Sequence, residues 1–131
     1  MTPEELKKRT KAYAIRAMKL ADSLPNTRSG NVIANQLIRS ATSVGANYRA
    51  VCRSRSDADF VSKAGVTLEE SDESVYWMEV IVESGMKPER QVAELLREGN
   101  ELVAIFVASS NTARRRLSKA HKRDSKTEPQ I

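Results

Sequence analysis

The sequence has few of the residues on which metal proteins and many enzymes depend. Among its 131 residues there is one cysteine, Cys52, and one histidine, His121. A single cysteine closes no disulfide within the chain and forms no zinc site. One histidine cannot supply the two Glu-x-x-His pairs of a di-metal carboxylate bundle. No Gly-rich phosphate-binding loop is present either. The sequence therefore predicts no metal, no cofactor and no enzymatic activity.

Long apolar runs are also missing. No stretch approaches the roughly 18 residues that a membrane-spanning helix needs. The opening residues, MTPEELKKRT, lack the apolar core and the cleavage site of a signal peptide. Apolar residues make up 40% of the chain and charged residues 30%, a composition typical of one soluble globular domain at this length. We expect a cytoplasmic protein that does not enter membranes, with Cys52 as a small buried apolar residue rather than a nucleophile.

No stretch shows the alternation of a β-strand, whereas four segments repeat apolar residues at helical spacing. The first follows Thr2 and Pro3, an N-cap with proline in the first helical position. It breaks at Pro25, and the second begins between Thr27 and Gly30. Ser40, Ala41 and Gly45 are small, so we expect another backbone to pack closely against this second helix.

The third and fourth segments are equally well marked. Ser56 is a good N-cap for the third helix, Gly85 is a C-terminal stop, and Pro88 suits the first turn of the fourth helix. The sequence predicts an all-α, up-down-up-down antiparallel four-helix bundle over residues 1–120. A basic, frayed tail should follow over residues 121–131, where no apolar pattern remains.

Two segments have more apolar surface than one bundle buries. VYWMEVIV (residues 75–82) contains one charged residue and LVAIFVA (residues 102–108) contains none. Because such all-round apolar character must be covered in a soluble protein, it predicts a homo-oligomer built through these helices, whose symmetry the apolar pattern does not determine. The expected interface residues are Val75, Tyr76, Trp77, Ile81, Val103 and Phe106. Stacking of Tyr76 and Trp77 on nucleic-acid bases is the weaker alternative.

Charge is distributed unevenly along the chain. Residues 30–56 carry four arginines and no acid, whereas residues 57–86 carry one lysine and eight acids. This succession favours two neighbouring helices joined by ion pairs. We expect structural pairs among Arg39, Arg49, Arg53, Arg55, Glu69, Glu70, Asp72 and Glu73. The alternative, phosphate binding by these arginines, is opposed by the adjacent carboxylates.

A second basic region has no such neutralising partner. Seven lysines and arginines fall between residues 114 and 126, opposed only by Asp124. With the bases of the first helix they form a candidate nucleic-acid-binding surface made of Arg114, Arg115, Arg116, Lys119, Lys122, Arg123, Lys7, Lys8, Arg9 and Lys11. A merely solvated tail is the competing interpretation.

Residues 30–85 resemble a known family. The stretches QLIRSATSVGANYRAVCRSRSDADFVSK and LEESDESVYWMEVI look like the bacterial four-helix-bundle family of the 23S rRNA intervening-sequence protein. The resemblance implies a four-helix bundle and a homopentameric barrel, as in a similar accessory protein of diversity-generating retroelements. It also implies RNA or DNA as a partner, because the retroelement relatives bind nucleic acid and a reverse transcriptase. Ala50-Val51 departs from the family pattern, which often places an acid here.

Two classes of function remain open on these grounds. One is a nucleic-acid-binding accessory module that neutralises phosphates. The other is a scaffold whose partner is another protein.

Overall fold

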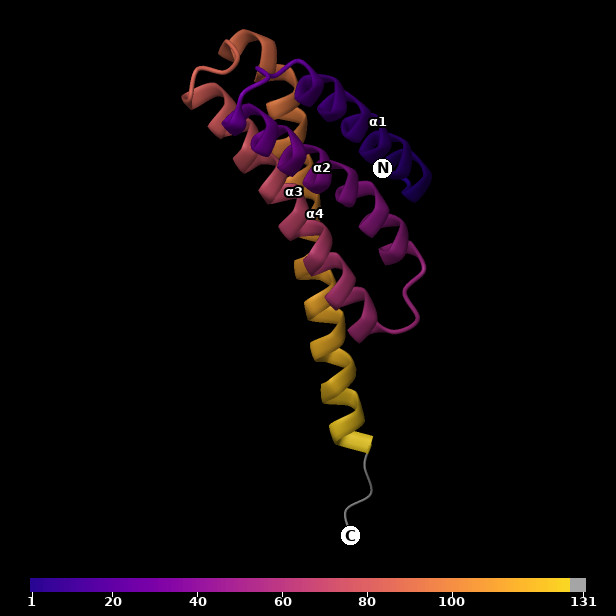
Figure 1. Cartoon of the computed structure of the whole chain (residues 1–131). Helices are drawn as coiled ribbons and strands as arrows, with labels where there is room; N and C mark the ends of the chain where they lie inside the picture. The colour runs from indigo at the N-terminus through magenta and orange to yellow at the C-terminus, as the bar shows by residue number, and fades with distance from the viewer. Residues whose placement is uncertain (128–131) are drawn as a thin grey trace.

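The computed structural model describes residues 1–127 and consists of four α-helices joined by short connections. They are α1 (Pro3–Asp22), α2 (Arg28–Cys52), α3 (Asp57–Glu83) and α4 (Glu89–Thr127). Successive helices run in opposite directions (Figure 1). No strand occurs in residues 1–127, so the predicted all-α class is confirmed.

The helices begin and end where the local sequence predicts. The Thr2 hydroxyl accepts a hydrogen bond from the Glu5 amide, and the Glu5 carboxylate accepts one from the Thr2 amide, both at 3.1 Å. Such reciprocal bonds satisfy amides that the first helical turn leaves unpaired. Thr27 and Ser56 cap α2 and α3 without the reciprocal bond: their hydroxyls accept hydrogen bonds from the Gly30 and Asp59 amides. Gly85 follows α3 with φ of 77°, a left-handed conformation that glycine adopts without steric cost.

One core lies between the four helices. Its largest fully buried side chains include Tyr13 of α1, Leu37 of α2, Met78 of α3 and Phe106 of α4. The small residues of α2 allow the close packing that was predicted, because a Cβ built on Gly45 would lie 3.2 Å from Oγ1 of Thr10. Within this core the Tyr13 hydroxyl and the Ser74 hydroxyl share a hydrogen bond of 2.7 Å.

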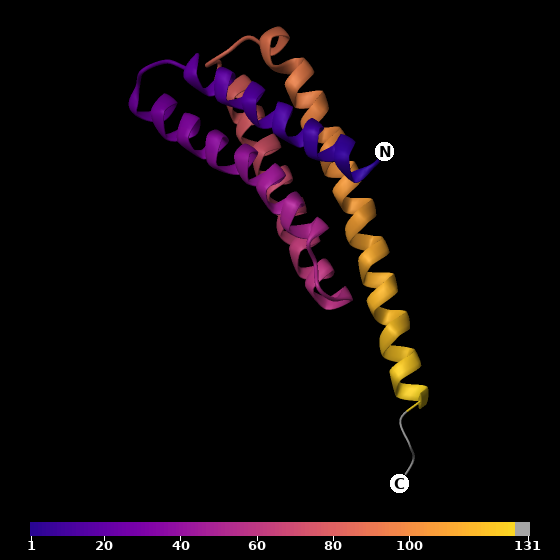
Figure 2. The same cartoon turned by 90° about the vertical axis from the view of Figure 1, so that its right-hand side faces the viewer.

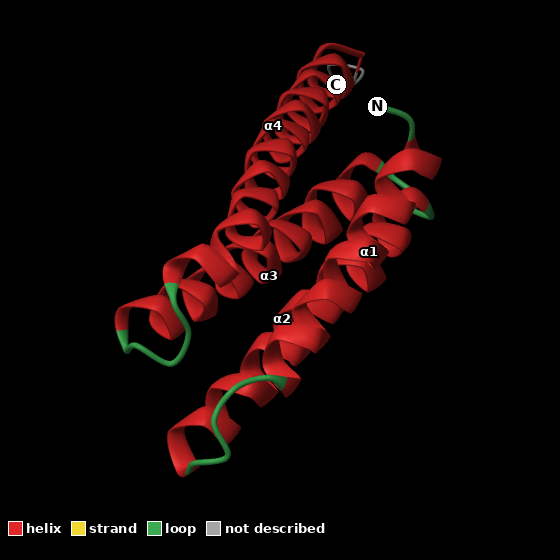
Figure 3. Ribbon diagram, turned by 90° about the horizontal axis from the view of Figure 1, so that it is seen from above, coloured by secondary structure: helices red, strands yellow, loops and turns green. Residues whose placement is uncertain are grey.

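The helices do not pack equally. α3 packs extensively against both α2 and α4, whereas α1 meets α4 over a much shorter length. Viewed from above, α3 lies between α4 and the pair formed by α1 and α2 (Figure 3). α4 is also the longest helix, and its C-terminal part extends beyond the end of the bundle (Figures 1 and 2). None of the helices in residues 1–127 combines the length and apolar character that crossing a membrane requires.

Three sequence-based expectations need correction. Helix α4 continues to Thr127, past the predicted boundary at residue 120, because exposed Lys and Arg favour helix even without an apolar stripe. Residues 128–131 of the predicted tail lie outside the described part of the chain. Val75, Ile81 and Phe106 are buried in the core of the single chain, so these predicted interface residues are not on the surface. Cys52 is exposed rather than buried, because it falls on the last turn of α2.

Candidate nucleic-acid interface

The C-terminal part of α4 carries the strongest concentration of positive charge. Ala113 is the last buried residue of the helix. Beyond it, six basic side chains are exposed over about three turns: Arg114, Arg115, Arg116, Lys119, Lys122 and Arg123. We call this set the basic end of α4. Because 3.6 residues complete a turn, five of the six (all but Arg114) fall within about 120° of the helix circumference and line one face of α4.

Only part of this charge is engaged within the chain. Arg114, Arg115, Lys119 and Lys122 have no ion-pair partner among residues 1–127. The guanidinium carbon of Arg116 lies 6.0 Å from the centroid of the Phe60 ring, at the outer range of a cation–π contact. This contact joins residues 56 positions apart in the chain, so no local sequence signal predicts it.

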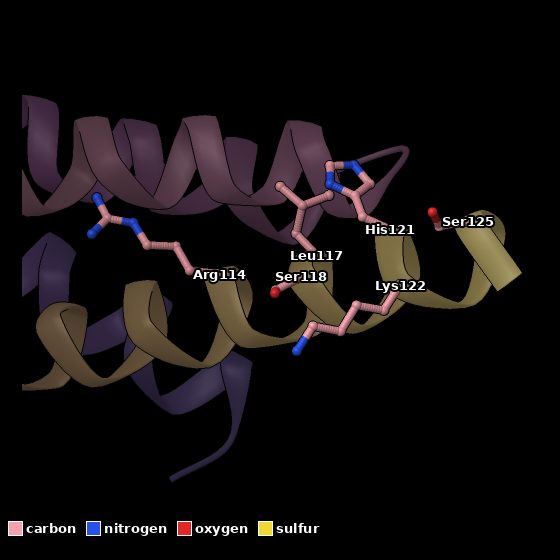
Figure 4. Close-up of a pocket in the computed structure, with 6 residues that line it drawn as sticks. All are labelled: Arg114, Leu117, Ser118, His121, Lys122 and Ser125. Atoms are coloured by element: carbon pink, nitrogen blue, oxygen red, sulfur yellow. The ribbon is translucent and has the colours of Figure 1, made fainter.

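One side of the basic end is less polar than the rest. Figure 4 shows Leu117 and His121 pointing to the same side of α4, with Lys122 on the other. Leu117 is half-buried and His121 is exposed. An extended ligand contacting this helix would therefore meet most of the cations on one face and an aliphatic side chain on another.

Arg9 of α1, one of the predicted nucleic-acid-binding residues, pairs with acids of α4. Arg9 donates from Nε to Glu98 Oε2 at 2.7 Å and also pairs with Glu101, so two acids of α4 compensate its charge. The hydrogen bonding of Arg9 to the Glu98 carboxylate is the largest of the effects that raise the pKa of Arg9 above its ordinary value. Glu101 precedes Arg114 by 13 residues, or roughly 20 Å of helix. The prediction that Arg9 belongs to a nucleic-acid surface is therefore not supported by its contacts.

The other α1 lysines differ from Arg9. Lys7 pairs with Glu4 at 3.1 Å within the first turns of the helix. Lys8 and Lys11 are exposed.

The predicted ion pairs between α2 and α3 are present in part. Arg39 reaches from α2 to two acids of α3, with Nη1 at 3.3 Å from Glu70 Oε2 and a second pair to Glu73. Its hydrogen bonds to Glu73 and then Glu70 raise the pKa of Arg39. This network joins neighbouring helices as the charge pattern predicts.

The remaining predicted members are not paired in this way. Arg49, Arg53, Arg55, Glu69 and Asp72 are exposed and have no ion pair with one another in residues 1–127. Arg53 is the C-cap of α2 and Arg55 lies in the turn before α3. Glu69 comes some three turns later on α3, so the two arginines of the turn are out of its reach.

Among the predicted interface residues, three do reach the surface of the single chain. Tyr76 is 55% exposed, while Trp77 and Val103 are half-buried. The Tyr76 and Trp77 rings contact each other edge to face, with centroids 4.9 Å apart. Together they form an aromatic pair on the outer side of α3. In residues 1–127 no group of three His, Cys, Asp or Glu side chains is placed to hold a metal ion.

Comparison with known proteins places this geometry in a family. No curated protein matches the chain in sequence. The chain is similar to a crystal structure described as a protein of unknown function from the S23 ribosomal protein family of Bacteroides thetaiotaomicron VPI-5482, at 27% identity and a TM-score of 0.76. That match covers 85% of this chain and 99% of the other. The family model of the 23S rRNA-intervening sequence protein matches residues 4–108, which include the four helices up to the middle of α4. The chain therefore belongs to the family of the 23S rRNA-intervening sequence protein.

Proposed function

We propose that this protein is a non-enzymatic accessory module that binds RNA or DNA through the basic end of α4. One observation carries the proposal: six exposed Lys and Arg side chains, five of them on one face, follow a helix that extends beyond the bundle. Such a row of positive charges matches the closely spaced phosphates of a nucleic-acid backbone. Binding of the phosphates to these side chains releases counterions from the nucleic acid.

The contacts should be to phosphates rather than to bases. Exposed Lys and Arg without a fixed polar network position a nucleic acid but do not read its sequence. We therefore expect RNA, single-stranded DNA and duplex DNA of unrelated sequence to bind with similar affinity per phosphate contacted.

We also propose that the protein works as a homo-oligomer, with a pentamer favoured by the family resemblance. The exposed Tyr76 and the half-buried Trp77 and Val103 support it, because apolar side chains on a surface gain from being covered. An oligomer would present several basic ends to one nucleic acid. That arrangement raises the apparent affinity without any new kind of contact.

A salt series with matched variants tests the proposal. Binding of fluorescein-labelled RNA and DNA is followed by anisotropy between low and physiological salt. In one variant Arg115, Lys119 and Lys122 become Gln. The matched control replaces Lys19, Arg28 and Arg90, three exposed bases at the opposite end of the bundle. Each phosphate contact contributes close to one unit to the slope of log affinity against log salt. The first variant should lose about two to three units of slope, and the control should bind like the unmodified protein.

Two results would reject the proposal. Equal losses in the variant and its control would show that net charge alone governs binding. Absence of binding at low salt to any of the nucleic acids would favour the second class of function, a scaffold for a protein partner. The surface aromatic pair of α3 would then be the first place to seek that partner.

A further inference from the structure

A cavity of about 630 Å³ lies where three helix ends meet the middle of α4. The start of α1, the end of α2 and the start of α3 converge on it. Its wall is mainly apolar and includes Leu6, Val51, Ala64 and Ile105. The volume falls within the range of about 300–1,000 Å³ that small-molecule sites occupy. Neither the family assignment nor the proposed contact with nucleic acid accounts for this cavity.

Three aromatic rings from different helices face the cavity. They belong to Tyr48 of α2, Phe60 of α3 and Phe106 of α4. The Tyr48 and Phe106 rings are tilted at 45° with centroids 5.8 Å apart. Aromatic rings favour offset and edge-to-face contacts with other rings. A flat ring system therefore fits these walls better than an aliphatic chain does.

The cavity has one charged lining side chain, and it is a cation. Lys7 is half-buried, and its present partner Glu4 is 78% exposed. Ion pairs of this exposed kind contribute little, so the Lys7 ammonium can exchange Glu4 for an anionic group of a ligand. Arg116, above the Phe60 ring, adds a second positive charge nearby. Glu4 carries a negative charge near the cavity, and this charge would oppose the binding of an anion.

The remaining polar groups are hydrogen-bonding and neutral. Ser54 and Ser109 contribute hydroxyls, Cys52 contributes a thiol, and Tyr48 contributes a phenol. Burial, ahead of its contact with the Cys52 thiol, raises the pKa of Tyr48 well above its ordinary value. Tyr48 is therefore a neutral O–H donor at physiological pH rather than an anion that would repel an acidic ligand.

We propose that this cavity is a binding site for a small aromatic anion. The ring system would lie against the Tyr48 and Phe60 rings, beside the largely covered Phe106, with its acidic group at the Lys7 ammonium. The proposal does not depend on the function assigned to the basic end of α4, which meets this cavity only at Arg116.

Two dyes that differ by one group test the proposal on the full chain. Anilinonaphthalene sulfonate carries a sulfonate, and N-phenyl-1-naphthylamine has the same ring system without it. Both should bind saturably in fluorescence titrations. Lys7→Gln should weaken binding of the sulfonate about fivefold, the effect of losing one partly exposed charge pair, and should leave the neutral dye unchanged. Lys8→Gln, which alters an exposed residue that does not line the cavity, should change neither.

Two further experiments test whether the dyes bind inside the cavity. One fills the cavity with a larger side chain, and the other measures the reactivity of the Cys52 thiol that lines it. Ser109→Phe places a ring in the cavity and should weaken both dyes more than tenfold; Ile105→Phe serves if that variant melts early. In the unmodified protein, the sulfonate dye should slow alkylation of the Cys52 thiol by iodoacetamide in proportion to occupancy. Replacing Arg115, Lys119 and Lys122 by Gln should not alter dye binding, which separates this site from the basic end of α4.

Several outcomes would overturn the proposal. One is non-saturable dye binding, and another is an equal loss in Lys7→Gln and Lys8→Gln. A third is dye binding that survives both filling variants, or a Cys52 alkylation rate that the dye does not change. If dye binding appears only when the protein is diluted to its single-chain form, another copy of the chain covers the cavity and the small-molecule assignment is wrong.

Discussion

At the scale of single residues, Gly99 of α4 shows how closely the core is packed. A Cβ built on Gly99 would lie 2.8 Å from the Tyr13 hydroxyl and 2.9 Å from Cγ2 of Val75. Both distances are too short for real contacts. Tyr13 is held by its bond to Ser74, and the branched side chain of Val75 has little rotameric freedom.

We therefore predict that Gly99→Ala destabilises the protein by about 1–2 kcal/mol, although alanine is the better helix former. Urea unfolding followed by circular dichroism measures this difference. Gly65→Ala is the matched control, because a Cβ on Gly65 of α3 would meet nothing within 4 Å. That substitution should stabilise the protein by about 0.5–1 kcal/mol. The same sign for both variants would contradict the packing argument.

Tyr13 should also make stability depend on alkaline pH. Burial, as the largest cause, raises the pKa of Tyr13 from 10.0 to about 12. The folded state thus keeps the phenol proton that the unfolded state loses. The contribution of the Tyr13 phenol to the free energy of unfolding is complete below pH 10 and disappears as the pH rises towards 12. Two units of pKa correspond to about 2.7 kcal/mol.

The measurement is urea unfolding of the unmodified protein and of Tyr13→Phe at pH 8 and pH 11.5. The phenylalanine variant should be less stable at pH 8, because it lacks the bond to Ser74. Its disadvantage should shrink at pH 11.5, since phenylalanine has no proton to lose. Tyr76→Phe, which changes an exposed tyrosine, controls for general alkaline effects. If the free energy of unfolding changes with pH in the same way in the unmodified protein and in Tyr13→Phe, Tyr13 is not the source of the alkaline pH dependence.

At the scale of helices, Arg9 stands out because it joins α1 to α4. Among the pairs of helices that pack together, these two pack over the shortest length. Its planar fork makes parallel bonds to the Glu98 carboxylate, a geometry that lysine cannot reproduce. The Arg9 side chain is 25% exposed, so solvent screening lowers the value of the pair.

We predict that Arg9→Lys destabilises the protein by about 1 kcal/mol and increases hydrogen exchange of α1 amides more than α3 amides. Hydrogen exchange with mass spectrometry measures both helices in one experiment. Lys8→Arg is the control, since Lys8 is exposed. Uniform protection of α1 in Arg9→Lys would show that core packing alone holds this helix.

The sequence predicts features that depend on near neighbours and misses those that depend on the faces of packed helices. Thr2, Ser56 and Gly85 act within three or four residues, and the structure confirms all three. Phe106 was expected at an interface because its helix is apolar all round, but only packing decides which face turns inward. The pair of Arg9 with Glu98 spans 89 residues, so no local pattern indicates it. The basic end of α4 was recognised from composition, whereas its helical extension was not.

At the scale of the whole molecule, the family match and the proposed binding surface do not coincide. The match ends at residue 108, and the basic end of α4 begins at Arg114. The bundle up to the middle of α4 is therefore what this chain shares with its family. The proposed contact with nucleic acid is made by a segment outside that match, so such binding would be a property of this chain's extension.

Assembly of the bundle into an oligomer is the last prediction. We expect a mass several times 14.6 kDa from light scattering at micromolar concentration. Tyr76→Gln should lower the mass, because this 55%-exposed ring loses its apolar contact with a neighbouring copy. The fold of each chain should persist, since Tyr76 is not part of the core. Ile15→Gln, at an exposed residue on α1, should leave the mass unchanged. A single-chain mass for the unmodified protein would remove the oligomer from the proposed function, and each basic end would then have to bind nucleic acid alone.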